Sequence, residues 1–134
     1  MSEKHSVAAI VVKNKQVLIG KRINVGQMGG RWEFPGGKVD LGETYEEALK
    51  REFREEFSQE VNVIQPIAEA QFLHNDKTVN LHAFHVELCS RNPLWVLTEH
   101  TEVEWVPFEE IKNRNFVDSD LLIYEKVKTY FENL

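Results

Sequence analysis

The chain has 134 residues, 42% of them hydrophobic, and this predicts one domain, residues 1–134, with a proper core. Its formal charge of −6 argues against a general nucleic-acid-binding surface. The one cysteine, Cys89, excludes an internal disulfide, fits a reducing cytosol and is expected to be a buried, inert thiol in an apolar run. No apolar stretch reaches the roughly 20 residues that span a bilayer, so we expect a cytoplasmic protein.

The N-terminal part of the chain is rich in residues that favour β-strands. Residues 6–12 and 16–21 form two such runs, and the polar segment Lys13-Asn14-Lys15 between them predicts a hairpin. Residues 22–30 contain several glycines and predict a flexible loop. A short strand, Trp32-Glu33-Phe34, then leads into the sequence Pro-Gly-Gly.

A helix is predicted over residues 45–57, because no glycine or proline interrupts this stretch. Thr44 and Glu47 form a capping box, in which each side chain can satisfy a free backbone N–H at the helix start. Apolar side chains recur on one stripe at about 100° per residue, and this stripe predicts the face that packs on the core. The residues of the stripe are Leu49, Phe53 and Phe57.

Three carboxylates lie on an arc beside this stripe, those of Glu52, Glu55 and Glu56. Like charges at helical spacing repel by roughly 0.2–0.5 kcal/mol per pair, and partial burial raises that cost. A solvated acidic face is the ordinary explanation for such a run. A divalent cation is the other, because Mg²⁺ binds carboxylate and phosphate oxygens and turns the repulsion into ligation.

The second half of the chain alternates between extended segments and turns. Residues 61–73 and 78–88 predict strands on either side of a turn at 74–77. His82 and His85 are three residues apart and should lie on opposite faces of a regular strand, which argues against a shared metal ion.

The C-terminal part predicts a short strand at residues 105–108, a helical turn at 109–113 and a final helix. The segment Asp118-Ser119-Asp120 offers an N-cap for that helix, with Asp120 as the favoured cap. The apolar residues of the final helix can form a packing stripe. They are Leu121, Leu122, Val127, Tyr130 and Phe131.

A segment around the predicted acidic helix resembles a known family signature. Five residues separate Gly37 from Glu43, and seven more separate Glu43 from the sequence Arg-Glu-Phe-Arg-Glu-Glu of residues 51–56. This pattern resembles the Nudix box, and the preceding Glu-Phe-Pro-Gly-Gly-Lys resembles its MutT-like branch. Ser58 and Gln59 depart from the pattern, which has a glycine and an aliphatic residue there; this affects the end of the helix and not the metal site.

The resemblance implies an α+β fold, the Nudix α/β/α sandwich with a mixed β-sheet, one long catalytic helix and a C-terminal helix. It also implies a site for Mg²⁺, with Mn²⁺ as an alternative. The implied ligands are a backbone carbonyl at Gly37 and the carboxylates of Glu52, Glu55, Glu56 and Glu99. Glu99 is chosen as the residue on a loop just before a strand, and Glu102 competes with it for this role.

The family chemistry is substitution at phosphorus by water, and a carboxylate must accept the proton of that water. The candidates are Glu99, Glu55 and Glu52. Glu43 matches the first glutamate of the box and is interpreted as a structural residue or outer ligand. Arg51 can pair with Glu47 and Glu55, four residues away on either side, and is interpreted as a residue that orients the acids.

Residues outside the acidic helix are candidates for substrate contacts. Arg22 and Lys38 supply positive charge for phosphate groups. By resemblance, Phe34 belongs to the neighbourhood of the nucleotide pocket, with a simple core role as the alternative. Asp118 or Ser119 would be the polar side chain that reads the base, although helix capping also explains both.

The function implied by the resemblance is Mg²⁺-dependent hydrolysis of a nucleoside triphosphate to a monophosphate and pyrophosphate, with 8-oxo-dGTP or a cytidine nucleotide as the first substrates. ADP-ribose, dinucleoside polyphosphates and RNA 5′ ends are alternatives within the family. Alternatives of another class are a nucleotide-binding module without turnover and a structural helix pair that no divalent metal stabilises. We expect a monomer or homodimer that binds a small-molecule nucleotide and neither membrane nor nucleic acid.

Overall fold

The structure is a computed structural model that describes residues 4–134. The strands are β1 (Lys4–Ile10), β2 (Val12–Lys13), β3 (Gln16–Arg22), β4 (Trp32–Glu33), β5 (Gly36–Lys38), β6 (Val61–His74), β7 (Lys77–Leu88) and β8 (His100–Val106). The helices are α1 (Tyr45–Phe57), the 3₁₀-helix η1 (Phe108–Asn113), α2 (Asp118–Leu121) and α3 (Tyr124–Glu132). No helix in this part of the chain has the length and apolar character needed to cross a membrane.

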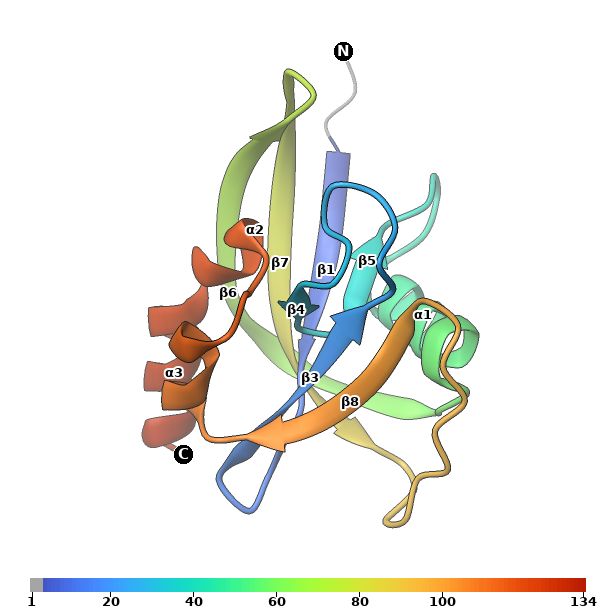
Figure 1. The fold of residues 1–134 in the computed structure, drawn as a ribbon, viewed down its shortest axis with the longest axis vertical. Helices are drawn as coiled ribbons and strands as arrows, with labels where there is room; N and C mark the ends of the chain where they lie inside the picture. The colour runs from blue at the N-terminus through green and yellow to red at the C-terminus, as the bar shows by residue number, and fades with distance from the viewer. Residues whose placement is uncertain (1–3) are drawn as a thin grey trace.

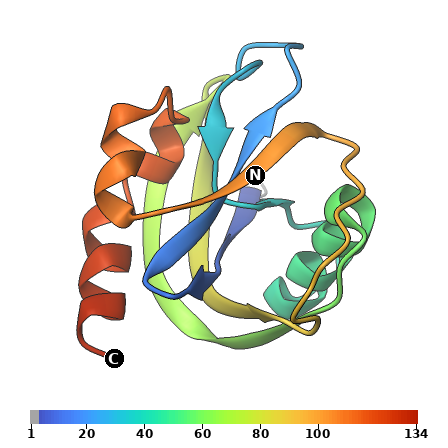
Figure 2. The same cartoon turned by 60° about the horizontal axis from the view of Figure 1, so that its bottom comes forward.

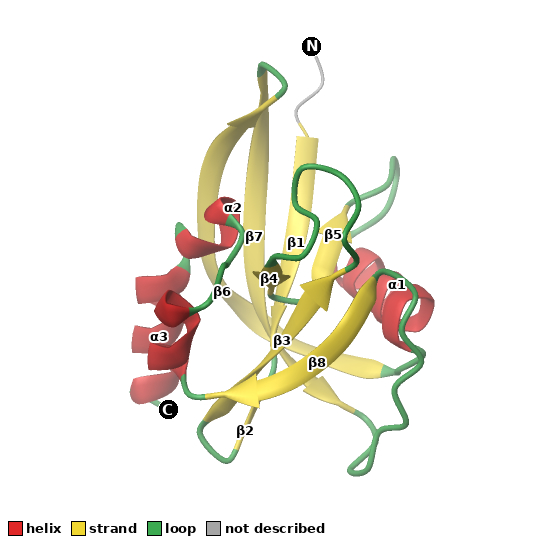
Figure 3. Ribbon diagram, in the orientation of Figure 1, coloured by secondary structure: helices red, strands yellow, loops and turns green. Residues whose placement is uncertain are grey.

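The strands form two sheets that lie between the helices (Figure 1). One sheet has the order β5-β1-β7-β6 and is mixed, because β1 and β7 run parallel while β1–β5 and β6–β7 are antiparallel. In the other sheet β3 pairs antiparallel with β2, β4 and β8. Helix α1 lies on one side of the strands and α2 and α3 lie on the other (Figures 2 and 3). The predicted α/β/α arrangement is therefore confirmed.

Strand β1 is buried on both faces and joins the two halves of the core. Ala8 and Ile10 pack in the cluster that includes residues of η1 and α3. Val7 and Ala9 point the other way, into the cluster formed with α1. A central strand that is covered on both faces reads as a continuous apolar run, and this explains the sequence Val-Ala-Ala-Ile.

Helix α1 has the predicted bounds and the predicted cap. The Thr44 hydroxyl accepts from Glu47 N at 3.1 Å, and the Glu47 carboxylate accepts from Thr44 N at 2.8 Å. Phe53 and Phe57 are fully buried on the stripe that faces the sheet. Ser58, which replaces the usual glycine, ends the helix with φ 54°, and the helix stops as it would with glycine there.

The predicted N-terminal hairpin is only partly correct. The turn lies at Asn14 and Lys15, which both have positive φ, but only Val12 and Lys13 pair across it with β3. Val11 O also accepts from Leu18 N at 2.9 Å, but β1, which ends at Ile10, belongs to the other sheet, where it pairs with β7 and β5. The local pattern predicted extended chain correctly, but the choice of partner strand depends on contacts between residues far apart in sequence.

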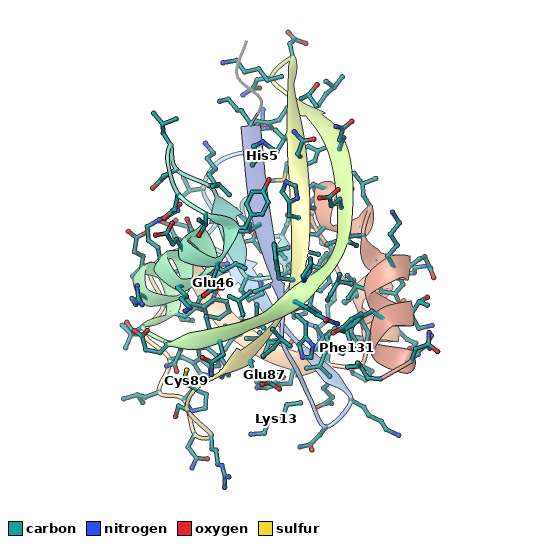
Figure 4. The ribbon with its side chains drawn as sticks, turned by 180° about the vertical axis from the view of Figure 1, so that it is seen from behind. His5, Lys13, Glu46, Glu87, Cys89 and Phe131 are labelled. Atoms are coloured by element: carbon teal, nitrogen blue, oxygen red, sulfur yellow. The ribbon has the colours of Figure 1, made fainter. Side chains whose placement is uncertain are left out.

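Two further expectations are corrected. Cys89 is exposed instead of buried, because β7 ends at Leu88 and Cys89 lies just beyond the end of the strand (Figure 4). The predicted final helix is divided into α2 and α3, and Leu121 and Leu122 are exposed at the break. Val127 and Phe131 pack on the core as predicted, and Ile123 and Tyr124 take the place of Leu121 and Leu122 there.

Candidate active site

The glycine-rich edge strand β5 brings the chain against the acidic face of α1. A Cβ built on Gly37 would lie 2.7 Å from Oε2 of Glu52, so only glycine leaves room for this carboxylate. Glu52 is 7% exposed and is held by Arg51, whose Nη1 donates to its Oε1 at 2.8 Å. The spacing of the sequence motif therefore corresponds to a direct contact between strand and helix.

Arg51 organises the carboxylates around it. Its Nε and Nη2 donate to the two oxygens of Glu43 at 2.6 and 2.9 Å, and its Nη1 also donates to Glu55 at 3.0 Å. Its Nη2 also donates to the Lys38 carbonyl at 2.9 Å. The hydrogen bond to Arg51 lowers the pKa of Glu43. The predicted pairing of Arg51 with Glu55 is confirmed. The predicted pairing with Glu47 is wrong, because the Glu47 carboxylate accepts from Thr44 N in the capping box, and Arg51 contacts Glu43 and Glu52 instead.

Glu56 lies in a crowded group of acids. Burial, a hydrogen bond with Glu52, and the charges of Glu52, Glu33 and Glu99 together raise its pKa to about 10. These four carboxylates come from α1, β4 and the loop before β8, so the structure brings together three predicted acids and adds Glu33. Glu55 is separate from this group: its side chain is 60% exposed and pairs with Arg51.

Sequence analysis assigned no role to Glu33 and His100, which complete this group. His100 Nε2 donates to Glu33 Oε2 at 2.8 Å, and Arg22 Nη1 reaches the same oxygen at 3.1 Å. Glu33 directly precedes Phe34 of the motif, and His100 directly follows Glu99, so their adjacency to assigned residues was the available signal. The competing candidate Glu102 is exposed on β8, where it pairs opposite Lys21.

The residues present fit a hard divalent cation. Among residues 4–134 no three His, Cys, Asp or Glu side chains already converge as metal ligands. The donor set is nonetheless rich in carboxylate oxygen, which Mg²⁺ and Mn²⁺ prefer. Burial and the charges of Glu52, Glu33 and Glu99 raise the pKa of Glu56 and so disfavour its ionised form, and a bound cation would offset that cost.

Glu33, one of these acids, lines a cavity of about 990 Å³. Its wall includes the predicted substrate residues Arg22, Phe34, Lys38 and Ser119, together with Gly37 and Glu43. Phe34 is 2% exposed and packs edge-on against Phe116, so it serves the core as well as the cavity. Lys38 is exposed at the end of strand β5.

Asp120 has a role that sequence analysis did not predict. It does not cap a helix: Val117 is the N-cap of α2, without a side-chain cap. Its buried carboxylate lies in the cavity wall and accepts from Phe34 N at 2.9 Å. Burial and the neighbouring charge of Glu33 raise its pKa to about 8. Asp118 is largely exposed and pairs with Arg31 at 3.1 Å, and it is not part of the cavity wall.

Comparisons with known proteins agree with this geometry. Residues 3–127 match the family model of the NUDIX domain. The CTP pyrophosphohydrolase of Escherichia coli K12 is 32% identical over 119 residues, which cover 89% of this chain and 87% of that protein. A putative 8-oxo-dGTP diphosphatase 2 of Mycobacterium tuberculosis is 34% identical over 118 residues, which cover 85% and 80%.

Solved structures have the same fold. The solution structure of the Escherichia coli ORF135 protein has a TM-score of 0.83 and 29% identity, and the match covers 96% of this chain and 91% of that one. The MutT protein from Methanosarcina mazei Go1 has a TM-score of 0.80 and 22% identity over the full length of this chain. The MutT-like assignment made from the sequence is confirmed, and the chain belongs to the NUDIX domain family of hydrolases.

Proposed function

We propose that this protein hydrolyses a nucleoside triphosphate to a nucleoside monophosphate and pyrophosphate. The observation that carries the proposal is that the acids adjoin a cavity of about 990 Å³ through Gly37 and Glu33, which line it. Gly37 lies against the Glu52 carboxylate, and the charge of Glu33 acts on Glu56. The relatives named CTP pyrophosphohydrolase and 8-oxo-dGTP diphosphatase support a cytidine nucleotide or an oxidised purine nucleotide as the substrate.

Nudix hydrolases generally use divalent metal ions, and we propose Mg²⁺ here, with Mn²⁺ as the substitute. Glu52, Glu55, Glu56, Glu99 and the Gly37 carbonyl would hold it. When bound, the metal supplies charge for the phosphate oxygens and acidifies the attacking water. Arg51 and Glu43 fix the positions of the helix carboxylates, since the Arg51 guanidinium contacts Glu43, Glu52 and Glu55 at once.

One of the carboxylates of the site would accept the proton of the attacking water. Glu99, Glu55 and Glu52 are the proposed candidates. Glu55 is exposed and Glu99 is exposed on a loop, so both can reach solvent, whereas Glu52 is buried against Gly37. These exposures favour Glu55 or Glu99 as the base, because a group that accepts a proton must also release it to water.

The cavity wall would bind the rest of the nucleotide. Arg22 and Lys38 supply the positive charge for the phosphate chain. Phe34 would border the nucleobase. Ser119 stays a candidate for the polar side chain that reads the base, and Asp120, next to it in the cavity wall, is a further candidate. A carboxyl with a pKa of about 8 can be protonated at neutral pH and then donates one hydrogen bond to a base.

The test is pyrophosphate and phosphate release from ordinary and oxidised nucleoside triphosphates, ADP-ribose and dinucleoside polyphosphates, with and without Mg²⁺. We expect Mg²⁺-dependent pyrophosphate release from CTP, dCTP or 8-oxo-dGTP, lost in Glu52→Gln and Glu55→Gln. Glu46→Gln, on the first turn of the same helix and paired with Lys50, is the control and should keep wild-type activity. Nucleotide binding without turnover across the whole panel would reject the triphosphatase assignment in favour of a binding module.

A further inference from the structure

His100 occupies a position built around its ring. The side chain is 0% exposed and stacks on Phe57, with ring centroids 4.9 Å apart and an interplanar angle of 22°. On the neighbouring strand β3, a Cβ on Gly20 would lie 2.8 Å from the ring atom Cδ2, so glycine is required beside it. The register of β3 with β8 shifts at this point, between Lys21 and Arg22. Such irregularities re-aim a side chain, and here they turn the imidazole toward the acids.

The two ring nitrogens face two different carboxylates. Nε2 donates to Glu33 Oε2 at 2.8 Å. Nδ1 lies 3.9 Å from Glu56 Oε1 and is a buried nitrogen for which residues 4–134 provide no hydrogen-bond partner. A buried polar atom without a partner costs about 1–3 kcal/mol, so its position calls for an explanation. The carboxylate that the structure places beside this nitrogen is that of Glu56, at a distance too long for a hydrogen bond.

Glu33 continues this chain of contacts toward the cavity. Arg22 Nη1 lies 3.1 and 3.3 Å from its two oxygens, and both Arg22 and Glu33 line the cavity wall. The contacts therefore run from Arg22 through Glu33 and His100 to Glu56 on α1. This path joins the side of the site that would hold phosphate to the side that would hold the metal.

We propose that His100 is a positioning residue, which fixes Glu33 by a hydrogen bond from one ring nitrogen, faces Glu56 with the other, and thereby prepares these carboxylates for the divalent cation. The inference rests on the proposed function and deepens it. Carboxylates that ligate metals are themselves fixed by hydrogen bonds from surrounding groups, and loss of such a partner typically lowers metal affinity or activity about 10- to 100-fold.

The test compares His100→Phe, which keeps the stacking on Phe57 and removes both nitrogens, with His100→Gln, which keeps a donor for Glu33. His85→Phe is the matched control, because His85 is a partly buried β7 histidine bonded to Tyr130. Mn²⁺ binding to substrate-free protein is measured by the electron paramagnetic resonance signal of free Mn²⁺. The thermal midpoint, kcat and KM are measured on the same samples.

We expect His100→Phe to weaken Mn²⁺ binding about 10- to 100-fold, to lower kcat more than it raises KM, and to remain folded. His100→Gln should bind Mn²⁺ more tightly than His100→Phe but more weakly than the wild type, because it keeps a donor for Glu33 and loses the nitrogen that faces Glu56. His85→Phe should bind Mn²⁺ as the wild type does. A folded His100→Phe with wild-type Mn²⁺ affinity would overturn the inference while leaving the proposed function intact. If His100→Phe does not fold, a His100→Gln protein with wild-type affinity and kcat overturns it instead. A wild-type protein that binds no Mn²⁺ would overturn both proposals.

Discussion

The backbone N–H of Phe34 donates to the Asp120 carboxylate across a buried 2.9 Å contact, which joins the end of strand β4 to helix α2. The two residues are 86 positions apart in the sequence. This contact ties the glycine-rich motif to the C-terminal helices. It also places a titratable group inside the cavity wall, so both stability and substrate recognition should depend on the state of Asp120.

Stability should therefore fall as the pH rises through the range in which Asp120 titrates. Its folded pKa is raised from 3.8 to about 8, so between these values the folded protein keeps a proton that the unfolded chain has released. Unfolding then releases a proton, and the free energy of unfolding decreases by at most about 1.4 kcal/mol per pH unit until the folded pKa is passed. Asp120→Asn should remove this part of the dependence.

The measurement is urea unfolding of wild type and Asp120→Asn at pH 5, 6, 7 and 8. The variant should gain stability relative to wild type as the pH rises. Asp118→Asn, on the same short helix but largely exposed, serves as the control and should stay parallel to wild type. Parallel curves for Asp120→Asn as well would contradict the buried, proton-binding state of this carboxyl.

Arg51 should not be replaceable by lysine. Its guanidinium donates to Glu43, Glu52, Glu55 and the Lys38 carbonyl, and a single ammonium group cannot reproduce this forked geometry. We expect Arg51→Lys to lower kcat/KM by roughly 10- to 100-fold, as for other residues that orient metal ligands. Arg54→Lys, which affects an exposed pair with Glu60 on the same helix, should retain activity. Equal activity of the two variants in a pyrophosphate-release assay would refute an orienting role.

Gly37→Ala should damage activity more than stability. The added methyl group would lie 2.7 Å from the Glu52 carboxylate and displace it, while the backbone of Gly37 has no positive φ that alanine would strain. We expect at least about a tenfold loss of kcat. Gly42→Ala should instead damage stability more than activity. Gly42 has φ +81°, which strains alanine, and open space around it, so this variant should lose about 1 kcal/mol of stability and keep its activity. Thermal melts and kinetics of both variants test this contrast.

Ser58→Gly should stabilise the protein. Ser58 has a left-handed conformation, φ 54° and ψ 43°, at the end of α1, where glycine avoids the steric cost of a Cβ. Part of that gain is offset by the greater freedom of glycine in the unfolded chain, so we expect about 0.5–1 kcal/mol. Ser58→Ala keeps the Cβ and should bring no gain. Denaturant unfolding that ranks alanine above glycine would contradict this explanation.

Local sequence patterns were sufficient to predict the acidic helix. The bounds of α1, its capping box and its buried stripe follow from contacts between residues three and four apart, which a local pattern records directly. The motif from Gly37 to Glu56 likewise predicted that the backbone at Gly37 and the glutamates of the helix belong to one site. The same local patterns predicted the turns near Asn14 and Asn75, where the backbone φ is positive.

The distant groups that meet at those acids became known from the three-dimensional fold. Whether β1 pairs with β3 or with β7, whether Asp120 caps a helix or enters the cavity wall, and whether His100 lies against Glu33 all depend on contacts between residues that are far apart in sequence. Such contacts depend on which faces are buried together, and local propensity does not specify them. The exposure of Cys89 has the same cause, because burial at a strand end depends on where its neighbouring strands stop.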